Sequence, residues 1–154
     1  MDAVRTLQRV IESDYRMAAL ETNDPERVVG LFKRLALTTG RATYHWQPES
    51  GLYRIGAEHI LIPRTRSPDD LLSYVQAARH FGVYVIEGFD NAMGRGSIQR
   101  QLLNIVNKDD DVRRLMLFMG DRVRVPEGLH PYTATLRQNT GTAAAGGGSS
   151  QQAS

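Results

Sequence analysis

The sequence predicts an α/β protein with three layers, in which helices cover both faces of a mostly parallel sheet. Segments with helical periodicity alternate with short apolar segments along most of the chain, and this alternation is typical of parallel sheets whose crossover connections are helices. Two of the short segments, residues 83–86 and 115–119, are continuously apolar, as strands buried on both faces are. We expect these two strands near the middle of the sheet.

The composition fits one folded domain. The chain has 154 residues, of which 41% are hydrophobic and 23% are charged, as in ordinary globular proteins. It contains no cysteine, which excludes disulfides, thiolate nucleophiles and cysteine-ligated metals. The 19 Lys and Arg residues exceed the 17 Asp and Glu residues by two, an excess too small to indicate dedicated nucleic-acid binding.

Nothing in the sequence has the pattern of a targeting signal or a membrane span. Residues 1–13 mix charged and apolar side chains and lack the apolar centre of a signal peptide. No segment approaches the roughly 20 apolar residues that a membrane helix needs. We therefore expect a cytoplasmic protein with no membrane partner.

Periodicity and residue type predict the elements of the first half of the chain. Residues 2–13 have apolar side chains at helical spacing, and residues 15–20 contain an apolar run of strand length. Residues 41–46 favour a second strand because they include threonine and aromatic side chains. Residues 52–55 and 59–62 are short extended segments that pair with each other or lie along an edge.

Capping residues and proline mark two further helices. Asn23 or Asp24 can cap a helix over residues 25–38, and Gly40 is its expected end. Ser67 is followed by proline and two aspartates, which are favoured in the first turn of a helix. The sequence therefore predicts a helix after each of these caps.

The second half of the chain continues the alternation. Gly82 is expected to end the second capped helix, and residues 83–86 follow as a strand. Residues 97–106 have helical spacing and lead to the strand at 115–119. Residues 129–136 are expected to add a last helical turn or two.

The domain is predicted to comprise residues 1–138. From Thr140 onward the chain consists of small and polar residues with no large apolar side chain. Such a segment buries too little surface to offset its chain entropy. We therefore expect residues 139–154 to be a disordered tail rich in Gly, Ala and Ser.

Acidic residues follow both predicted central strands. Glu87 and Asp90 come after the first, and Asp121 comes after the second. Ligands of open α/β sheets bind beyond the carboxyl ends of the strands, so these three residues form a candidate ligand-binding face. One alternative is a nucleotide site in which Glu87 and Asp90 hold Mg²⁺; the other is that these residues only end strands and form turns.

The sequence lacks the phosphate-binding loop that a nucleotide site of this kind needs. That loop, G-x-x-x-x-G-K-[ST], wraps phosphates in backbone N–H groups and reaches the terminal phosphate with its lysine. No Gly-Lys pair occurs in the chain, and residues 21–25, after the first predicted strand, contain two carboxylates and no glycine. The four histidines have no metal-binding spacing. We expect no catalytic residue, no metal and no cofactor.

Arginines supply candidate partner-binding residues. Arg54, Arg64 and Arg66 lie close together in the sequence after the second predicted strand, and they form a basic edge or are isolated solvated side chains. A less favoured alternative is nucleic-acid binding by six arginines of the second half of the chain, which are Arg95, Arg100, Arg113, Arg114, Arg122 and Arg124.

Several motifs occur in an order that resembles a known family: PERVV (25–29), TYHW (43–46), SGL (50–52), VYVIEGFD (83–90), IQRQLL (98–103), RLMLFM (114–119) and VPEGL (125–129). Together they resemble the N-terminal, P-loop-lacking portion of the AAA ATPases known as hypothetical chloroplast reading-frame proteins, of plastids and cyanobacteria. The resemblance covers most of residues 4–136. It implies a degenerate RecA-like domain that contacts neighbouring subunits or clients and does not hydrolyse ATP.

The expected function combines this resemblance with the missing loop. We expect a non-catalytic, AAA-like binding, regulatory or assembly subunit that acts through protein–protein contacts. No ATPase motif follows residue 136, so the expected partner is a separate AAA ATPase or further copies of this chain. The alternatives are a Mg²⁺-nucleotide-binding protein or ATPase and, less favoured, a nucleic-acid-binding module.

Overall fold

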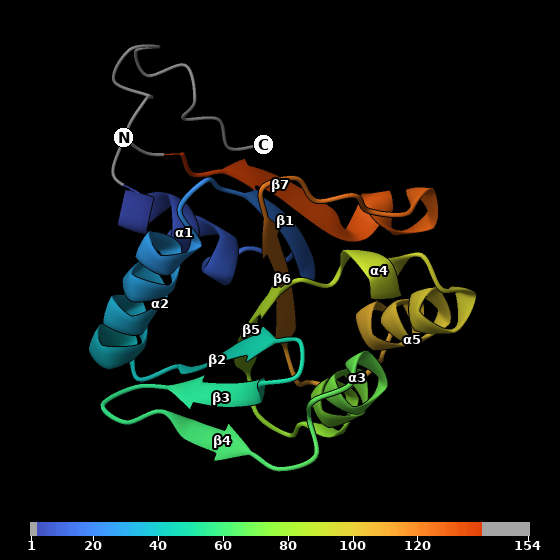
Figure 1. The fold of residues 1–154 in the computed structure, drawn as a ribbon, viewed down its shortest axis with the longest axis horizontal. Coiled ribbons are helices and arrows are strands. Elements are labelled where there is room, and N and C mark those ends of the chain that lie inside the picture. Colours follow the sequence, from blue (N-terminus) through green and yellow to red (C-terminus); the bar gives the residue numbers. More distant parts are fainter. Residues whose placement is uncertain (1–2, 140–154) are drawn as a thin grey trace.

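A computed structural model describes residues 3–139 and confirms the predicted three-layer α/β architecture (Figure 1). One seven-stranded sheet has the order β4-β3-β2-β5-β6-β1-β7. Its strands are β1 (Met17–Glu21), β2 (Ala42–Gln47), β3 (Gly51–Ile55), β4 (Ile60–Ile62), β5 (Gly82–Glu87), β6 (Arg114–Gly120) and β7 (Thr133–Arg137). The five strands from β2 to β7 in this order are parallel, and β3 and β4 add an antiparallel edge.

Helices cover both faces of the sheet (Figure 1). They are α1 (Ala3–Glu12), α2 (Pro25–Thr39), α3 (Pro68–Ala77), α4 (Asp90–Met93), α5 (Gly96–Val106) and a 3₁₀ helix, η1 (Glu127–Tyr132). Helices α1 and α2 pack on one face, and α3, α4 and α5 pack on the other. Within residues 3–139, no helix is both long enough and apolar enough to span a bilayer.

Each face of the sheet has its own hydrophobic core. Side chains alternate between faces along a strand, so Val83 and Val85 of β5 face α1 and α2, whereas Tyr84 and Ile86 face α3 and α5. All four are buried. Burial on both faces explains why this strand is continuously apolar in the sequence.

The predicted helix ends follow from local chemistry. Asp24 is the residue that caps α2, since its Oδ1 accepts a hydrogen bond from the Arg27 amide at 3.3 Å. Gly40 ends this helix in the left-handed conformation, with φ 72°, which glycine adopts at low cost. Ser67 caps α3 by accepting a hydrogen bond from the Asp70 amide.

Two predicted elements are wrong. Helix α3 ends at Ala77, and Gly82 is instead the first residue of β5; a Cβ there would lie 2.8 Å from the Tyr84 hydroxyl. Residues 129–136 are not helical throughout, because a short 3₁₀ helix gives way to strand β7 at Thr133. In β7 the threonines alternate with buried Ala134 and Leu136, a period of two that indicates a strand.

Arginines at the amino ends of the strands cap three helices. Helices that lead into parallel strands run back along the sheet, so their C-terminal carbonyls gather at the amino ends of those strands, where cations stabilise them. Each arginine donates hydrogen bonds to such carbonyls: Arg16 to Val106 at the end of α5, Arg113 to Ile11 near the end of α1, and Arg114 to Val75 near the end of α3. Arg114 is 2% exposed.

The predicted domain boundary at 138 stays a prediction. Apart from Asn139, the predicted tail lies outside the described residues.

Candidate functional site

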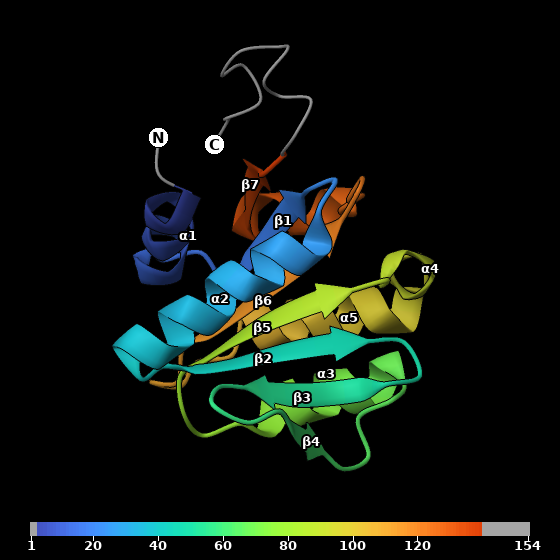
Figure 2. The same cartoon turned by 60° about the vertical axis from the view of Figure 1, so that its left-hand side comes forward.

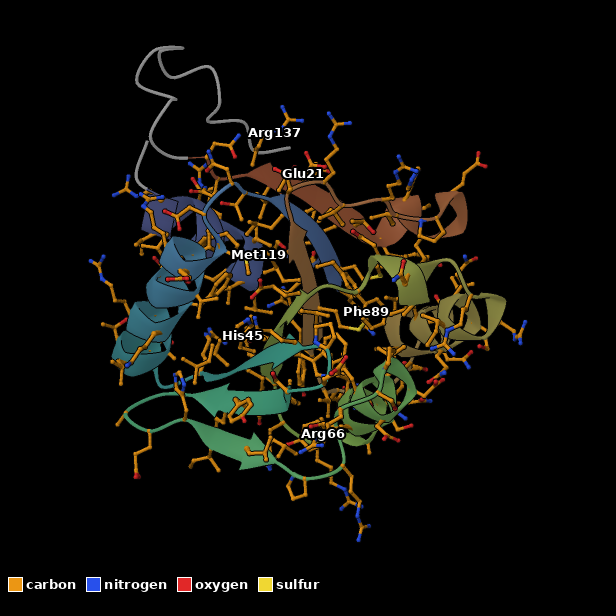
Figure 3. All side chains as sticks on the ribbon, in the orientation of Figure 1. Glu21, His45, Arg66, Phe89, Met119 and Arg137 are labelled. Atoms are coloured by element: carbon orange, nitrogen blue, oxygen red, sulfur yellow. The ribbon has the colours of Figure 1, made fainter. Side chains whose placement is uncertain are left out.

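The predicted strand-end segments meet at one edge of the sheet. Glu21 at the end of β1 is in register with Gly120 of β6, and Glu87 at the end of β5 is in register with Met119. Figure 3 shows Glu21 and Met119 near the ends of their strands, with His45 on the side of α2 and Phe89 on the side of α5. The side chains at this edge are thus divided between the two faces.

A cleft opens at this edge on the α2 face. Its volume is about 840 Å³, within the range of small-molecule sites. It lies between the first turns of α2 and strands β2 and β3, and we call it the strand-end cleft. Its lining consists of Asn23, Asp24, Pro25, Glu26, Val29, His45, Gln47, Ser50, Tyr53, Ile55, His59 and Glu87.

A histidine and a carboxylate pair lies in this cleft. His45 of β2 and Trp46 point to opposite faces of the sheet, so Trp46 is buried against α3 while His45 faces α2. The His45 Nε2 lies 2.5 Å from the Glu87 Oε1. Both side chains are about one-fifth exposed, at 18% and 20%. The pair can hold a polar group of a ligand by hydrogen bonding.

The connection between β1 and α2 is short and firmly held. It consists of Thr22, Asn23 and Asp24. Thr22 is 2% exposed; its amide donates to the Gly120 carbonyl at 2.9 Å, and its hydroxyl donates to the Gln138 carbonyl. The Asp24 amide in turn donates to the Thr22 hydroxyl at 3.0 Å. These bonds fix the chain against the ends of β6 and β7.

The amino end of α2 faces the strand-end cleft with its own carboxylate cap. A helix N-terminus attracts anions through its free N–H groups and its dipole. Here the side chain of Asp24 accepts the Arg27 amide, and Glu26 lies in the same turn. Together with Glu87 they give the cleft three carboxylates, and no lysine or arginine is among its described lining residues.

The three candidate ligand-binding residues do not meet in one place. Glu87 lines the strand-end cleft, whereas Asp90 lines a separate recess with Arg122 and Arg124. Asp121 is exposed in the loop after β6 and lines neither. A ligand-binding face that joins all three residues therefore stays a prediction. Their separation does not favour it.

Glu21 has a structural task at this edge. Its Oε2 accepts a hydrogen bond from the Val123 amide at 3.0 Å, and its Oε1 lies 3.4 Å from a nitrogen of Arg137. Figure 3 shows Glu21 and Arg137 side by side. The loop after β6 is thereby fastened to β1 and β7.

The three candidate partner-binding arginines surround the outer strand β4. Arg54 on β3 is in register with Ile60 at the start of β4. Arg64 and Arg66 follow the end of β4, and all three are exposed. Arg66 is labelled beside this part of the chain in Figure 3.

Sequence reasoning missed the other polar groups of the strand-end cleft. His45 and His59 have no metal-binding or catalytic spacing in the sequence, and they meet Tyr53 only through the pairing of β2 with β3 and β5. The alternation of His45 with Trp46 was the available signal, but it fixes a face only after the strand register is known. Among residues 3–139 there is no group of three or more potential metal ligands.

The three-layer architecture with its mostly parallel sheet is that of an α/β protein of the RecA/AAA type. The chain matches the family of SpoVK-like AAA ATPase N-terminal domains over residues 3–137. Since this match covers most of the 154 residues, the chain belongs to that family. The predicted kinship with an N-terminal portion of AAA ATPases is confirmed, and the plastid and cyanobacterial group stays a prediction. Comparison with curated proteins and with solved structures gives no significant match.

Proposed function

We propose that this domain is a non-catalytic binding and regulatory module of AAA ATPases, which acts through contacts with other proteins. The observation that carries the proposal is the connection at residues 22–24. A phosphate-binding loop needs the glycine-rich segment G-x-x-x-x-G-K-[ST] between this strand and the first turn of the helix. The connection here has three residues, one of them buried, so it offers no series of free N–H groups around a phosphate.

The charges of the strand-end cleft support the same proposal. A nucleoside triphosphate is bound by cations and by backbone N–H groups. The described lining residues instead include Asp24, Glu26 and Glu87. A polyphosphate placed there would be repelled by these carboxylates, because like charges in a partly desolvated site destabilise each other.

The alternatives receive less support. A magnesium site made by Glu87 and Asp90 would require side chains that line different recesses to converge. A nucleic-acid surface would lose Arg113 and Arg114, which are engaged with helix carbonyls. The proposed partner is a separate AAA ATPase or further copies of the chain, in the cytoplasm.

Titration with Mg²⁺ and ATP tests the proposal. We expect no change in the thermal unfolding midpoint up to millimolar nucleotide and no release of phosphate. A bound ligand at about 100 times its dissociation constant would stabilise the domain by about 2.7 kcal/mol. Saturable stabilisation that is lost in Glu87→Gln would contradict the proposal, because it would place the nucleotide in the strand-end cleft.

A further inference from the structure

Strand β4 is an open edge of the sheet with apolar side chains exposed to solvent. Within the described residues it pairs with β3 alone. Ile60 and Leu61 are 56% and 44% exposed. An edge strand presents unpaired backbone N–H and C=O groups that can pair with another extended chain. Figure 2 shows β4 at the outer end of the sheet, away from α2.

This edge is held in place before any partner arrives. The Thr65 hydroxyl donates to the Ile62 carbonyl at 2.7 Å and accepts the Leu52 amide at 2.8 Å. The Trp46 indole donates to the Thr65 carbonyl at 2.6 Å. Thr65 and Trp46 are both 1% exposed. A strand fixed to the core in this way loses little entropy when another strand pairs with it.

Positive charge stands at both ends of β4. Arg54 lies opposite Ile60, and Arg64 and Arg66 follow Ile62. No carboxylate of the described chain lies within ion-pair distance of these three arginines. A second copy of the chain would bring arginines against arginines, which is unfavourable, whereas acidic side chains of another segment would be attracted.

The backbone at Arg64 gives an independent indication. Arg64 has φ 58°, a left-handed conformation that glycine or asparagine adopts more easily. Arg64 lies in the bend that the Thr65 hydroxyl closes by donating to the Ile62 carbonyl, and there an arginine carries a backbone cost that glycine would not. Strain of this kind is commonly kept where the side chain has a functional role.

We propose that β4 binds an extended partner segment that has a short apolar centre and acidic residues on both sides of it. The segment pairs with the backbone of β4, its apolar centre covers Ile60 and Leu61, and its carboxylates meet Arg54 at one end and Arg64 and Arg66 at the other. This inference rests on the proposed function, for which it names the contact surface and the chemistry of the partner.

The test uses the full chain and a fluorescent synthetic peptide, Glu-Glu-Val-Ile-Val-Glu-Glu. We expect saturable binding by fluorescence anisotropy, weaker binding at high salt, and slower amide hydrogen exchange at residues 60–62. The peptide Lys-Lys-Val-Ile-Val-Lys-Lys should not bind. Equal binding of both peptides, or no binding of either, would overturn the proposal.

Two matched glycine variants separate charge from backbone strain. Arg64→Gly relieves the left-handed conformation and should fold at least as well as the natural chain, but it should weaken peptide binding roughly two- to fivefold, as the loss of one exposed ion pair predicts. Glu49→Gly relieves the other non-glycine residue with positive φ, at 67°, and should leave binding unchanged or stronger. Equal affinity of the natural chain and Arg64→Gly would overturn the assignment of Arg64.

Three further outcomes are distinct from these. If sedimentation shows a dimer that Arg64→Gly strengthens and that excludes the acidic peptide, β4 pairs with a second copy and the acidic partner is wrong. If Mg²⁺-ATP binds in the strand-end cleft while the peptide still binds β4, the proposed function fails in its nucleotide claim and the β4 surface stands. If neither ligand binds, the β4 surface fails and the absence of nucleotide binding stands.

Discussion

The parallel strands use charged side chains in opposite ways at their two ends. We call the side of the sheet at their amino ends the amino edge, and the side at their carboxyl ends the carboxyl edge. At the amino edge, the buried Arg114 donates to helix carbonyls of α3 and to Asp110 on the preceding loop. At the carboxyl edge, Glu87 has His45 as its hydrogen-bond partner within the described chain and faces a cleft of about 840 Å³. The Arg114 guanidinium has its hydrogen-bond acceptors within the fold, whereas the Glu87 carboxylate can accept a further hydrogen bond.

Helix direction explains the difference. The C-terminal carbonyls of α1, α3 and α5 meet the amino edge and are satisfied by arginines of the strands and loops there. The N-terminus of α2 meets the carboxyl edge, where Asp24 takes up its free amide. The comparison teaches that the amino edge maintains the fold, whereas the carboxyl edge is where ligands of open α/β sheets bind.

The largest effect is expected from Arg114→Met. The substitution leaves buried carbonyls and the Asp110 carboxylate without their donor, so the free energy of unfolding should fall by about 3–5 kcal/mol. Urea unfolding followed by circular dichroism measures it. Arg124→Met, at an exposed position, is the control and should change stability by less than about 0.5 kcal/mol. Equal small losses in both variants would remove the contrast between the edges.

The next effect concerns the residue that follows Glu87. Gly88 has φ 67°, and a Cβ there would lie 2.8 Å from the Pro48 Cγ. Gly88→Ala should therefore lower the free energy of unfolding by about 1–3 kcal/mol. In Gly128→Ala, the control, the added Cβ meets no atom within 4 Å, and the change should stay within about 0.5 kcal/mol. Equal midpoints in urea for Gly88→Ala and the natural chain would contradict this reading.

A smaller effect is expected from Glu87→Gln. The carboxylate is one-fifth exposed and has one described partner, so its loss should change the free energy of unfolding by less than about 1 kcal/mol. Urea unfolding of Glu87→Gln and Arg114→Met under the same conditions compares the two losses directly. A loss as large as that of Arg114→Met would show that Glu87 is needed for folding, and the distinction between the two edges would be wrong.

The smallest effect concerns acid stability. The hydrogen bond from Arg114 holds the pKa of the exposed Asp110 below its ordinary value. Because the folded pKa is lowered, this stabilisation is present above the ordinary carboxyl pKa of about 4, and it is lost as the pH falls through the folded value. Asp110→Asn should make the unfolding midpoint less dependent on pH below about pH 4. If the unfolding midpoints of Asp110→Asn and of the natural chain depended on pH in the same way, the pairing of Arg114 with Asp110 would be contradicted.

Local chemistry allowed much of the fold to be predicted. The cap at Ser67, the end at Gly40 and the central strands β5 and β6 depend on nearby residues and were confirmed, and the cap of α2 was narrowed to Asn23 or Asp24. Strand β7 was missed because Ala134 and Leu136 are its two apolar residues, and their period of two was outweighed by the helical spacing of leucines. Its place beside β1 depends on a tertiary pairing that no local pattern specifies.

The candidate site was predictable only in part. That Glu87 ends a strand and that no phosphate loop follows β1 are local facts. The pairing of His45 with Glu87 depends on the parallel register of β2 and β5, and the division of Glu87 from Asp90 depends on which face each side chain takes. Register and face are set by the packing of the sheet, not by neighbours in the chain.

The most direct test of the central claim is a titration of the ¹⁵N-labelled full chain with Mg²⁺-ATP, followed by two-dimensional NMR. The account predicts that the amides of Thr22, Asp24 and Glu87 keep their chemical shifts up to millimolar nucleotide. Saturable shifts at these amides, absent in Glu87→Gln, would show that the strand-end cleft binds nucleotide and would contradict the account.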